Sequence, residues 1–295
     1  MTVIGVLAFV SIKHLYPILF LQIIWGTGLA AVEVIHGVPL SEDLGQHYIT
    51  LGVPIGASLV AAFGLIIFSS SKFFLCKRIK SMLLFKLILY ICIVLDLIAI
   101  CSLFGRSPVL ASSLTILMFI ILKIGFMESK IVTKSKQFIW YLFVIMLLSI
   151  VATQVLSDYW LNRLLRFFNN YEEEPRMLLI KPAMEFISEN WLGYGLNSSD
   201  FLVGYHPHNI FIEVTLSAGI IGLSFMLLLV LLYAICMMKS INLNPSITSM
   251  SMVALFLFLV WMTSYSLAHS YILFSAIAMV IKTVDEGFVP QESID

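Results

Sequence analysis

Residues 204–238 read GYHPHNIFIEVTLSAGIIGLSFMLLLVLLYAICMM. The stretch opens with two histidines and an asparagine and continues as an apolar run that exceeds the roughly 20 residues needed to cross a bilayer. It closes the one long polar segment of the sequence, which begins at Asp158. A polar, arginine-bearing segment that leads a histidine to the start of a membrane helix is typical of a functional site. We therefore regard residues 158–222 as the region around which the chain is organised.

The composition is that of a membrane protein. Of the 295 residues, 60% are hydrophobic and 12% are charged, and the mean hydropathy is +1.02. This charge content is too low for the surface of a soluble domain, so we predict an all-α, polytopic membrane helical bundle. The formal net charge of zero gives no basic field for nucleic acid. The four cysteines form no CxxC pair and are interpreted as apolar packing residues.

Apolar runs separated by polar gaps predict about eight spans and one long external loop with short helices. The first residues lack a basic region and are expected to stay as membrane helix. We expect three regions: N-terminal transmembrane helices over 1–157, an external loop over 158–209, and C-terminal transmembrane helices with a short cytoplasmic tail over 210–295. The predicted spans are 15–35, 51–69, 83–104, 109–127, 138–156, 210–238, 252–267 and 271–284.

Lysine and arginine separate to opposite sides of this topology. Eleven of the twelve lysines fall on the predicted cytoplasmic side, with Lys181 as the exception, whereas Arg78 is the one arginine there. The other four are external: Arg106, Arg163, Arg166 and Arg176. Arginine on the disfavoured side indicates a need for a planar, permanently charged fork, which suits phosphate oxygens. Salt bridges to the acidic run at 172–174 are the alternative.

Two short helices are predicted in the external loop. Residues 159–168 place leucines at helical spacing with Arg163 and Arg166 off the apolar stripe, as in a helix at the membrane surface. A second helix starts after Pro175 with Arg176 in its first turn, where an anion is also favoured. Pro182 is expected to kink this helix and Gly193 to end it.

The histidine motif has a physical interpretation of its own. Asn209 is placed to cap the helix that starts near Ile210, and His208 at its start can accept a proton from a hydroxyl. Gly219 and Gly222 would let another helix or a lipid tail approach closely. A hydrogen-bonded structural role is the alternative for His208.

Three further features have open interpretations. Glu213 could orient a base or pair with an arginine. The mid-span acid Asp96 is either functional or hydrogen-bonded within the bundle. A metal site formed by His206 and His208 with Asp200 is an alternative chemistry, and we predict none.

The sequence resembles the O-antigen ligase and polymerase family of membrane glycosyltransferases. The resemblance is carried by GYHPHN at 204–209 with GIIG at 219–222, by Arg176 leading to WLGYGL at 191–196, and by the Gly105-Arg106-Ser107 turn. It covers about 100–284 and implies a GT-C-like fold. Family members usually carry more helices before this turn, so we expect a chain shortened at its N-terminus. The leucine often found four residues after the ligase arginine is Ile180 here.

The resemblance implies a polyprenyl-diphosphate-linked glycan donor, a glycan or lipid-core acceptor, and no cofactor. Arg176 and Arg106 would neutralise the diphosphate, with His208 as the base. The predicted substrate-binding residues are Arg163, Arg166, His206, Asn209, Glu213, Gly219 and Gly222.

The mismatch at Ile180 favours polymerase over ligase. A lipid-linked glycan transporter or flippase and a non-catalytic assembly partner are the alternatives outside enzymology. The expected location is the bacterial inner membrane, with the active loop on the external or periplasmic side and in contact with membrane lipid.

Overall fold

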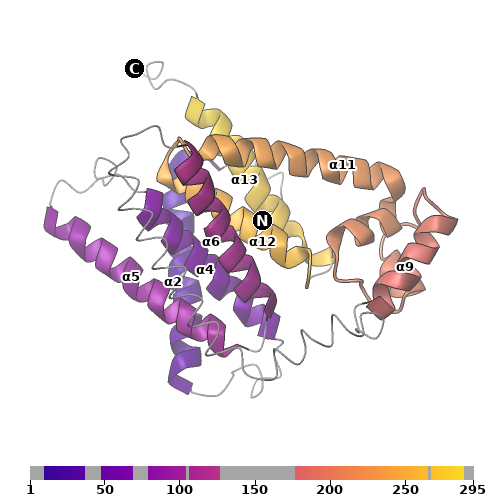
Figure 1. The fold of residues 1–295 in the computed structure, drawn as a ribbon, viewed down its shortest axis with the longest axis horizontal. Helices are drawn as coiled ribbons and strands as arrows, with labels where there is room; N and C mark the ends of the chain where they lie inside the picture. Colours follow the sequence, from indigo (N-terminus) through magenta and orange to yellow (C-terminus); the bar gives the residue numbers. More distant parts are fainter. Residues whose placement is uncertain are drawn as a thin grey trace. The chain divides into compact units, whose positions relative to one another are not determined.

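The computed structural model describes residues 10–36, 48–68, 79–103, 106–126, 177–264 and 267–288. Within these ranges every regular element is a helix, as the composition predicted (Figure 1). The helices are α2 (Ile12–His36), α4 (Tyr48–Phe68), α5 (Ile79–Ser102), α6 (Arg106–Phe126), α9 (Met177–Glu189), α10 (Ser198–Leu202), α11 (Ile210–Ser240), α12 (Pro245–Trp261), the 3₁₀ turn η2 (Leu267–His269) and α13 (Tyr271–Phe288).

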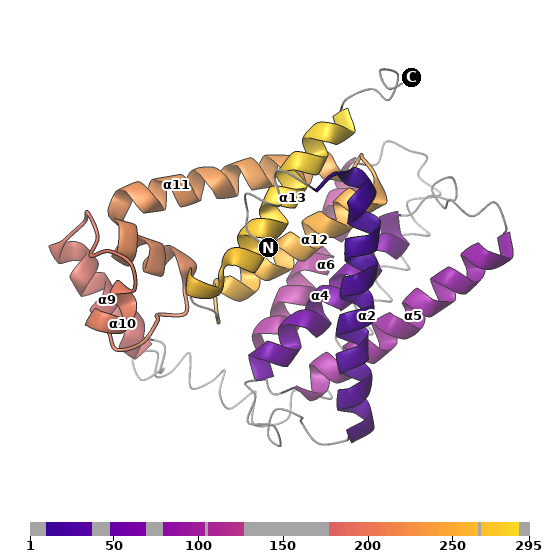
Figure 2. The same cartoon turned by 180° about the vertical axis from the view of Figure 1, so that it is seen from behind.

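The chain divides into two compact units. Unit 1 takes the described residues of Met1–Glu128, Tyr233–Val260 and Tyr271–Asp295, and unit 2 those of Ser129–Leu232 and Trp261–Ser270. In unit 1, α4 contacts α2, α5 and α6, and Figures 1 and 2 show the four helices side by side. A Cβ on Gly26 of α2 would lie 2.3 Å from the carbonyl oxygen of Pro54 in α4. Glycine therefore lets these two helices pack closely.

Within unit 1, α12 packs on both the end of α11 and α4. Asn244 accepts a hydrogen bond from the backbone N–H of Ser246 and so begins α12, with Pro245 in the first turn, where proline is well tolerated. The hydroxyl of Tyr233, near the end of α11, donates to the carbonyl of Ser251 over 2.7 Å. A Cβ on Gly56 of α4 would lie 2.5 Å from the ring of Phe256, so α12 also packs tightly on α4.

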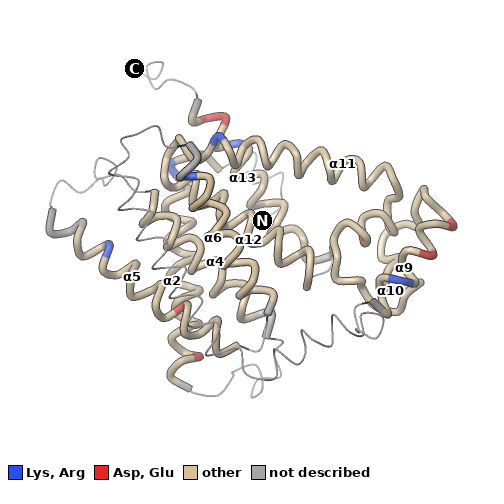
Figure 3. Tube along the Cα trace, in the orientation of Figure 1, with Lys and Arg blue, Asp and Glu red and all other residues tan. Residues whose placement is uncertain are grey.

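Four of the described helices are long and apolar enough to cross a membrane: α2, α4, α5 and α11. α6 and α12 are apolar but shorter, and Figure 3 shows no charged residue along α4 or α12. The predicted spans coincide with helices at 15–35, 51–69, 83–104, 109–127 and 271–284, within a few residues at most ends. The predicted span 138–156 and the surface helix 159–168 lie outside the described residues.

One predicted span has the wrong bounds. The sequence predicted a helix over 252–267, whereas α12 runs over Pro245–Trp261 and is followed by turns and η2. Its start was missed because polar residues at 244–251 interrupt the apolar pattern, although Ser246 and Ser249 are fully buried. Its end was missed because the residues after Trp261 were included in the apolar run. These residues, 262–270, belong to unit 2.

Candidate functional site

Unit 2 contains α9, α10 and the first part of α11, and α11 is interrupted there. Gly219 has φ 63° and ψ −159°, values outside the helical region, so α11 consists of the segments 210–218 and 220–240. The second segment is roughly 31 Å long at 1.5 Å per residue, close to the hydrocarbon thickness of a bilayer. The sequence predicted one continuous helix, which is wrong at this residue. Left-handed φ explains why a glycine occupies the break.

The loop after α9 satisfies the backbone groups that the break exposes. The N–H groups of Tyr194 and Gly195 donate to the carbonyls of Leu216 and Ser217, each over 2.9 Å. In the opposite direction, the N–H of Ile220 donates to the carbonyl of Trp191 over 2.9 Å. Non-helical backbone near a membrane is tolerated only when its polar groups have partners. The loop 191–195 therefore stabilises the interruption of α11.

Two glycines allow this contact. A Cβ on Gly219 would lie 2.3 Å from the carbonyl carbon of Leu192, and a Cβ on Gly193 would lie 2.5 Å from the amide nitrogen of Gly219. Gly193 also has a positive φ of 89°. The close approach predicted at Gly219 is present, but it comes from a loop and not from another helix. The motifs WLGYGL and GIIG are thus in direct contact.

His208 is fixed at the start of α11. Its φ is 54°, a left-handed conformation that few non-glycine residues adopt, and its side chain is half-buried. Its Nδ1 lies 3.1 Å from the carbonyl oxygen of Ser264. Since a carbonyl can only accept, Nδ1 carries the proton, and the lone pair of the neutral ring is on Nε2. The imidazole is therefore in the tautomer in which Nε2 can act as a base.

Two further residues of this helix start have defined contacts. The Oδ1 of Asn209 accepts hydrogen bonds from the N–H groups of Phe211 and Ile212, at 3.0 and 3.3 Å, so Asn209 is the predicted cap. Glu213 is 5% exposed, and its Oε2 accepts a hydrogen bond from the N–H of Leu267 over 2.8 Å. His208 and Glu213 thus connect Ser264 and Leu267 to the start of α11.

An aromatic cluster surrounds His208. The rings of Tyr205 and His206 stack at 4.1 Å, and the rings of His206 and His208 meet edge to face at 4.6 Å. Burial lowers the pKa of His206, the carboxylate of Asp200 opposes this shift, and the charge of His269 adds to it. His206 therefore favours its neutral form, and the third histidine, His269, lies within electrostatic range of it.

The sequence did not single out the segment that contains Ser264, Leu267 and His269. A signal was available, because polar residues cluster at 263–266 and again at 269–270 in an otherwise apolar region. The predicted apolar span 252–267 included residues 263–266. Within the described residues, no group of three His, Cys, Asp or Glu side chains is arranged to hold a metal ion.

Of the four predicted external arginines, Arg106 falls within the described residues. Arg163, Arg166 and Arg176 lie outside the described residues, and α9 begins at Met177. Arg106 is the first residue of α6 in unit 1. A Cβ on Gly222, the last predicted site residue, would meet Ala218 and Val214 of its own helix.

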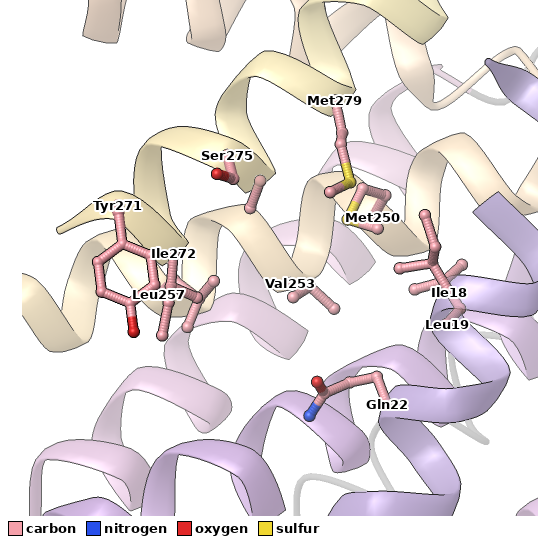
Figure 4. A pocket seen from close by; sticks show the side chains of 11 residues that line it. Ile18, Leu19, Gln22, Met250, Val253, Leu257, Tyr271, Ile272, Ser275 and Met279 are labelled. Atoms are coloured by element: carbon pink, nitrogen blue, oxygen red, sulfur yellow. The ribbon is translucent and has the colours of Figure 1, made fainter. Parts of the chain in front are cut away.

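A cavity of about 210 Å³ lies elsewhere, in unit 1, between α2, α12 and α13. Figure 4 shows that Gln22, Ser275 and Tyr271 bring polar atoms to a lining that is otherwise apolar. Gln22 donates to the carbonyl of Pro54 over 3.1 Å. None of the predicted site residues lines this cavity, and its chemistry suits an apolar chain better than a sugar or a phosphate.

The apolar helices and the polar cluster at the start of α11 define the class, a helical membrane protein. Residues 91–227 match the family model described as O-antigen ligase, a range that includes Arg106, Arg176 and His208. This match supports an O-antigen ligase/polymerase-like family for the chain, in agreement with the resemblance that its motifs predicted. No curated protein and no solved structure shows significant similarity to the chain.

Proposed function

We propose that the chain is a membrane glycosyltransferase that joins oligosaccharide units carried on a polyprenyl diphosphate during the assembly of a surface polysaccharide. The match to an O-antigen ligase family supports the substrate class. The observation that carries the proposal is the hydrogen bond from His208 Nδ1 to the carbonyl of Ser264, because it orients the imidazole as a base. A transporter or flippase and a non-catalytic assembly partner are the alternatives.

His208 is the catalytic base of this proposal. Its Nε2 takes the proton of a hydroxyl on the acceptor sugar as that oxygen attacks the anomeric carbon of the donor. The bond between the anomeric carbon and the diphosphate oxygen breaks, and the diphosphate leaves with the electron pair. The neighbouring neutral ring of His206 lines the acceptor side, with Asn209 and Glu213 holding the helix start.

The arginines are proposed to stabilise the leaving group of the reaction. Arg176 and Arg106 are the groups proposed to neutralise the charge that develops on the leaving diphosphate, with Arg163 and Arg166 as further contacts. One guanidinium group can bind two phosphate oxygens at once, and it remains charged. No metal is therefore needed in this scheme. Loss of one such contact commonly costs a hundredfold or more in rate, about 3 kcal/mol in the barrier.

Exposed apolar side chains support a site at the membrane boundary. In unit 2, Leu196 is 91% exposed and Phe201 is 93% exposed, and Trp191 and Leu192 are also exposed. Such side chains in the loop beside a membrane helix suit insertion into the lipid headgroup region. The location that follows is the inner membrane of a bacterium, with this loop on the external or periplasmic face. The eight spans and the GT-C-like fold remain predictions.

Polymerase and ligase use the same donor and differ in the acceptor. The Ile180 mismatch favours a polymerase, for which the acceptor is a second lipid-linked glycan. The description of the matched family favours a ligase, for which the acceptor is a sugar of the lipid A core. We place the polymerase first, because the residue four positions after the predicted catalytic arginine departs from the ligase pattern.

The test is complementation in two bacterial hosts that make the lipid-linked unit, one lacking its polymerase and one lacking its ligase. A glycan ladder in the first host supports the polymerase, and transfer to the lipid core in the second supports the ligase. His208→Ala should abolish the product at equal protein level, whereas His14→Ala, which removes an exposed histidine of α2, should retain it. Product from His208→Ala at the wild-type level would remove the base from the mechanism.

A further inference from the structure

A buried acid lies inside unit 1. Asp96 of α5 is 0% exposed, and neither of its carboxylate oxygens has a hydrogen-bond partner. An ionised carboxylate in such surroundings is unfavourable unless a positive charge or hydrogen-bond donors neutralise it. The carboxylate of Asp96 therefore requires a neutralising group.

Two hydroxyls from neighbouring helices lie beside the carboxylate: Thr27 of α2 and Ser58 of α4. They are 3.1 Å from each other, and Ser58 Oγ donates its proton to the carbonyl of Ile23 over 3.2 Å. Because Ser58 has one proton, Thr27 is the donor in the contact between the two hydroxyls. The two hydroxyl protons cannot serve both of these contacts and the carboxylate of Asp96 at the same time.

No basic side chain offsets the charge among the residues that the structure describes around Asp96. α4 carries no charged residue. Lys123 of α6 donates to the carbonyl of Ile67 and lies over the ring of Phe68, near the far end of α4. The titratable group that faces Asp96 on its own helix is the thiol of Cys92, one turn away. Glu33 of α2 lies nearly two turns beyond Thr27 and is itself acidic.

We propose that Asp96, Thr27 and Ser58 form a binding site for a small monovalent cation, either a proton or Na⁺. The oxygens available are a carboxylate and two hydroxyls with lone pairs, a hard donor set that suits such a cation. One positive charge neutralises one carboxylate, whereas a divalent ion would leave a net charge inside the membrane. The occupied site joins α2, α4 and α5 and is separate from the proposed glycosyl transfer.

The experiment uses the full chain purified and placed in lipid nanodiscs. The infrared spectrum of the Asp96→Asn variant is subtracted from that of the wild type, with Na⁺ or with choline as the cation and over a range of pH. A carboxylic acid band in the difference reports the proton-bound form. Thermal melting in the same buffers reports Na⁺ binding, which should raise the melting temperature of the wild type in a saturable way.

The matched control is Glu185→Gln, which removes an exposed carboxylate of α9 and should keep both signals of the wild type. If Asp96→Asn does not fold, the double variant Thr27→Val with Ser58→Ala replaces it, and it should need more Na⁺ for the same rise in melting temperature.

Three outcomes support the site. A carboxylic acid band that Na⁺ leaves unchanged shows that the site binds a proton, and a band that Na⁺ removes shows that the two ions compete for it. A melting temperature that depends on Na⁺, without a carboxylic acid band, shows that the site binds Na⁺ alone. Absence of both signals at every pH overturns the proposal. Equal responses of the wild type and Asp96→Asn, or of the wild type and the double variant, also overturn it.

Discussion

A Cβ placed on Gly193 would lie 2.5 Å from the amide nitrogen of Gly219, so the loop after α9 and the break in α11 fit together through two residues without side chains. Ile220 and Trp191 close the same contact with a hydrogen bond of 2.9 Å between their backbones. The start of α11, which carries His208, is therefore positioned by a contact between two distant motifs of the sequence.

Gly219→Ala should destabilise the protein. Its φ of 63° is left-handed, and the added Cβ would collide with the backbone of Leu192. The left-handed conformation alone costs about 1–2 kcal/mol in a residue with a side chain, and the collision adds to this. We expect a lower melting temperature in detergent and faster proteolysis of the loop 190–195.

Two glycine variants serve as controls. Gly28→Ala on α2 meets nothing within 4 Å and should be neutral or slightly stabilising. Gly204 has a positive φ of 79°, but a Cβ added there would meet no atom within 4 Å. Gly204→Ala therefore measures the cost of the backbone conformation without a collision. Equal melting temperatures for Gly219→Ala and Gly204→Ala would show that the collision with Leu192 is unimportant.

Asn209→Ala should lose the cap of α11, at a cost of about 0.5–2 kcal/mol in the free energy of unfolding. Asn209→Ser should retain most of the stability, because serine also accepts the N–H groups of the first turn. Melting curves of the two variants test this ranking. If Asn209→Ser is stable and yet forms no polysaccharide, Asn209 also binds substrate, as the sequence predicted.

Glu213→Ala should be more damaging than Glu213→Gln. The alanine leaves the N–H of Leu267 without its acceptor, and a buried donor without a partner costs about 1–3 kcal/mol. Glutamine keeps an acceptor oxygen in the same place, so it should hold the segment 264–267 and its hydrogen bond to His208. The melting temperature and the polysaccharide product are measured together. Two variants with equal losses would mean that the charge, and not the acceptor, is required.

The sequence predicted the helices best where the apolar runs were long and bounded by charge, as in α2, α4 and α5. It predicted the cap at Asn209 because the residue type and the following run were both visible. It failed at Gly219, since a glycine in an apolar run fits a continuous helix equally well until its distant partner, Trp191, is known. It also failed at Ser264, which reaches His208 through a backbone carbonyl that every residue type shares.

His206 provides the pH-dependent prediction. Its pKa is lowered from 6.5 by burial, so the unfolded chain binds its proton more readily than the folded chain. By linkage, this histidine does not lower the free energy of unfolding above pH 6.5. As the pH falls from 6.5 toward the pKa of the folded chain, its protonation in the unfolded chain lowers the free energy of unfolding progressively. His206→Phe keeps an aromatic ring beside Tyr205 and cannot titrate.

We therefore expect the melting temperature of the wild type to fall relative to that of His206→Phe on acidification through this range. Asp200→Asn removes the carboxylate that raises the pKa, so its decline should begin at the same pH and continue to a lower pH than that of the wild type. A proton titration of the His206 ring by NMR checks the same quantity directly. A midpoint above 6.5, or one that rises in Asp200→Asn, would show that the field of Asp200 and the burial of the ring do not act as the geometry implies.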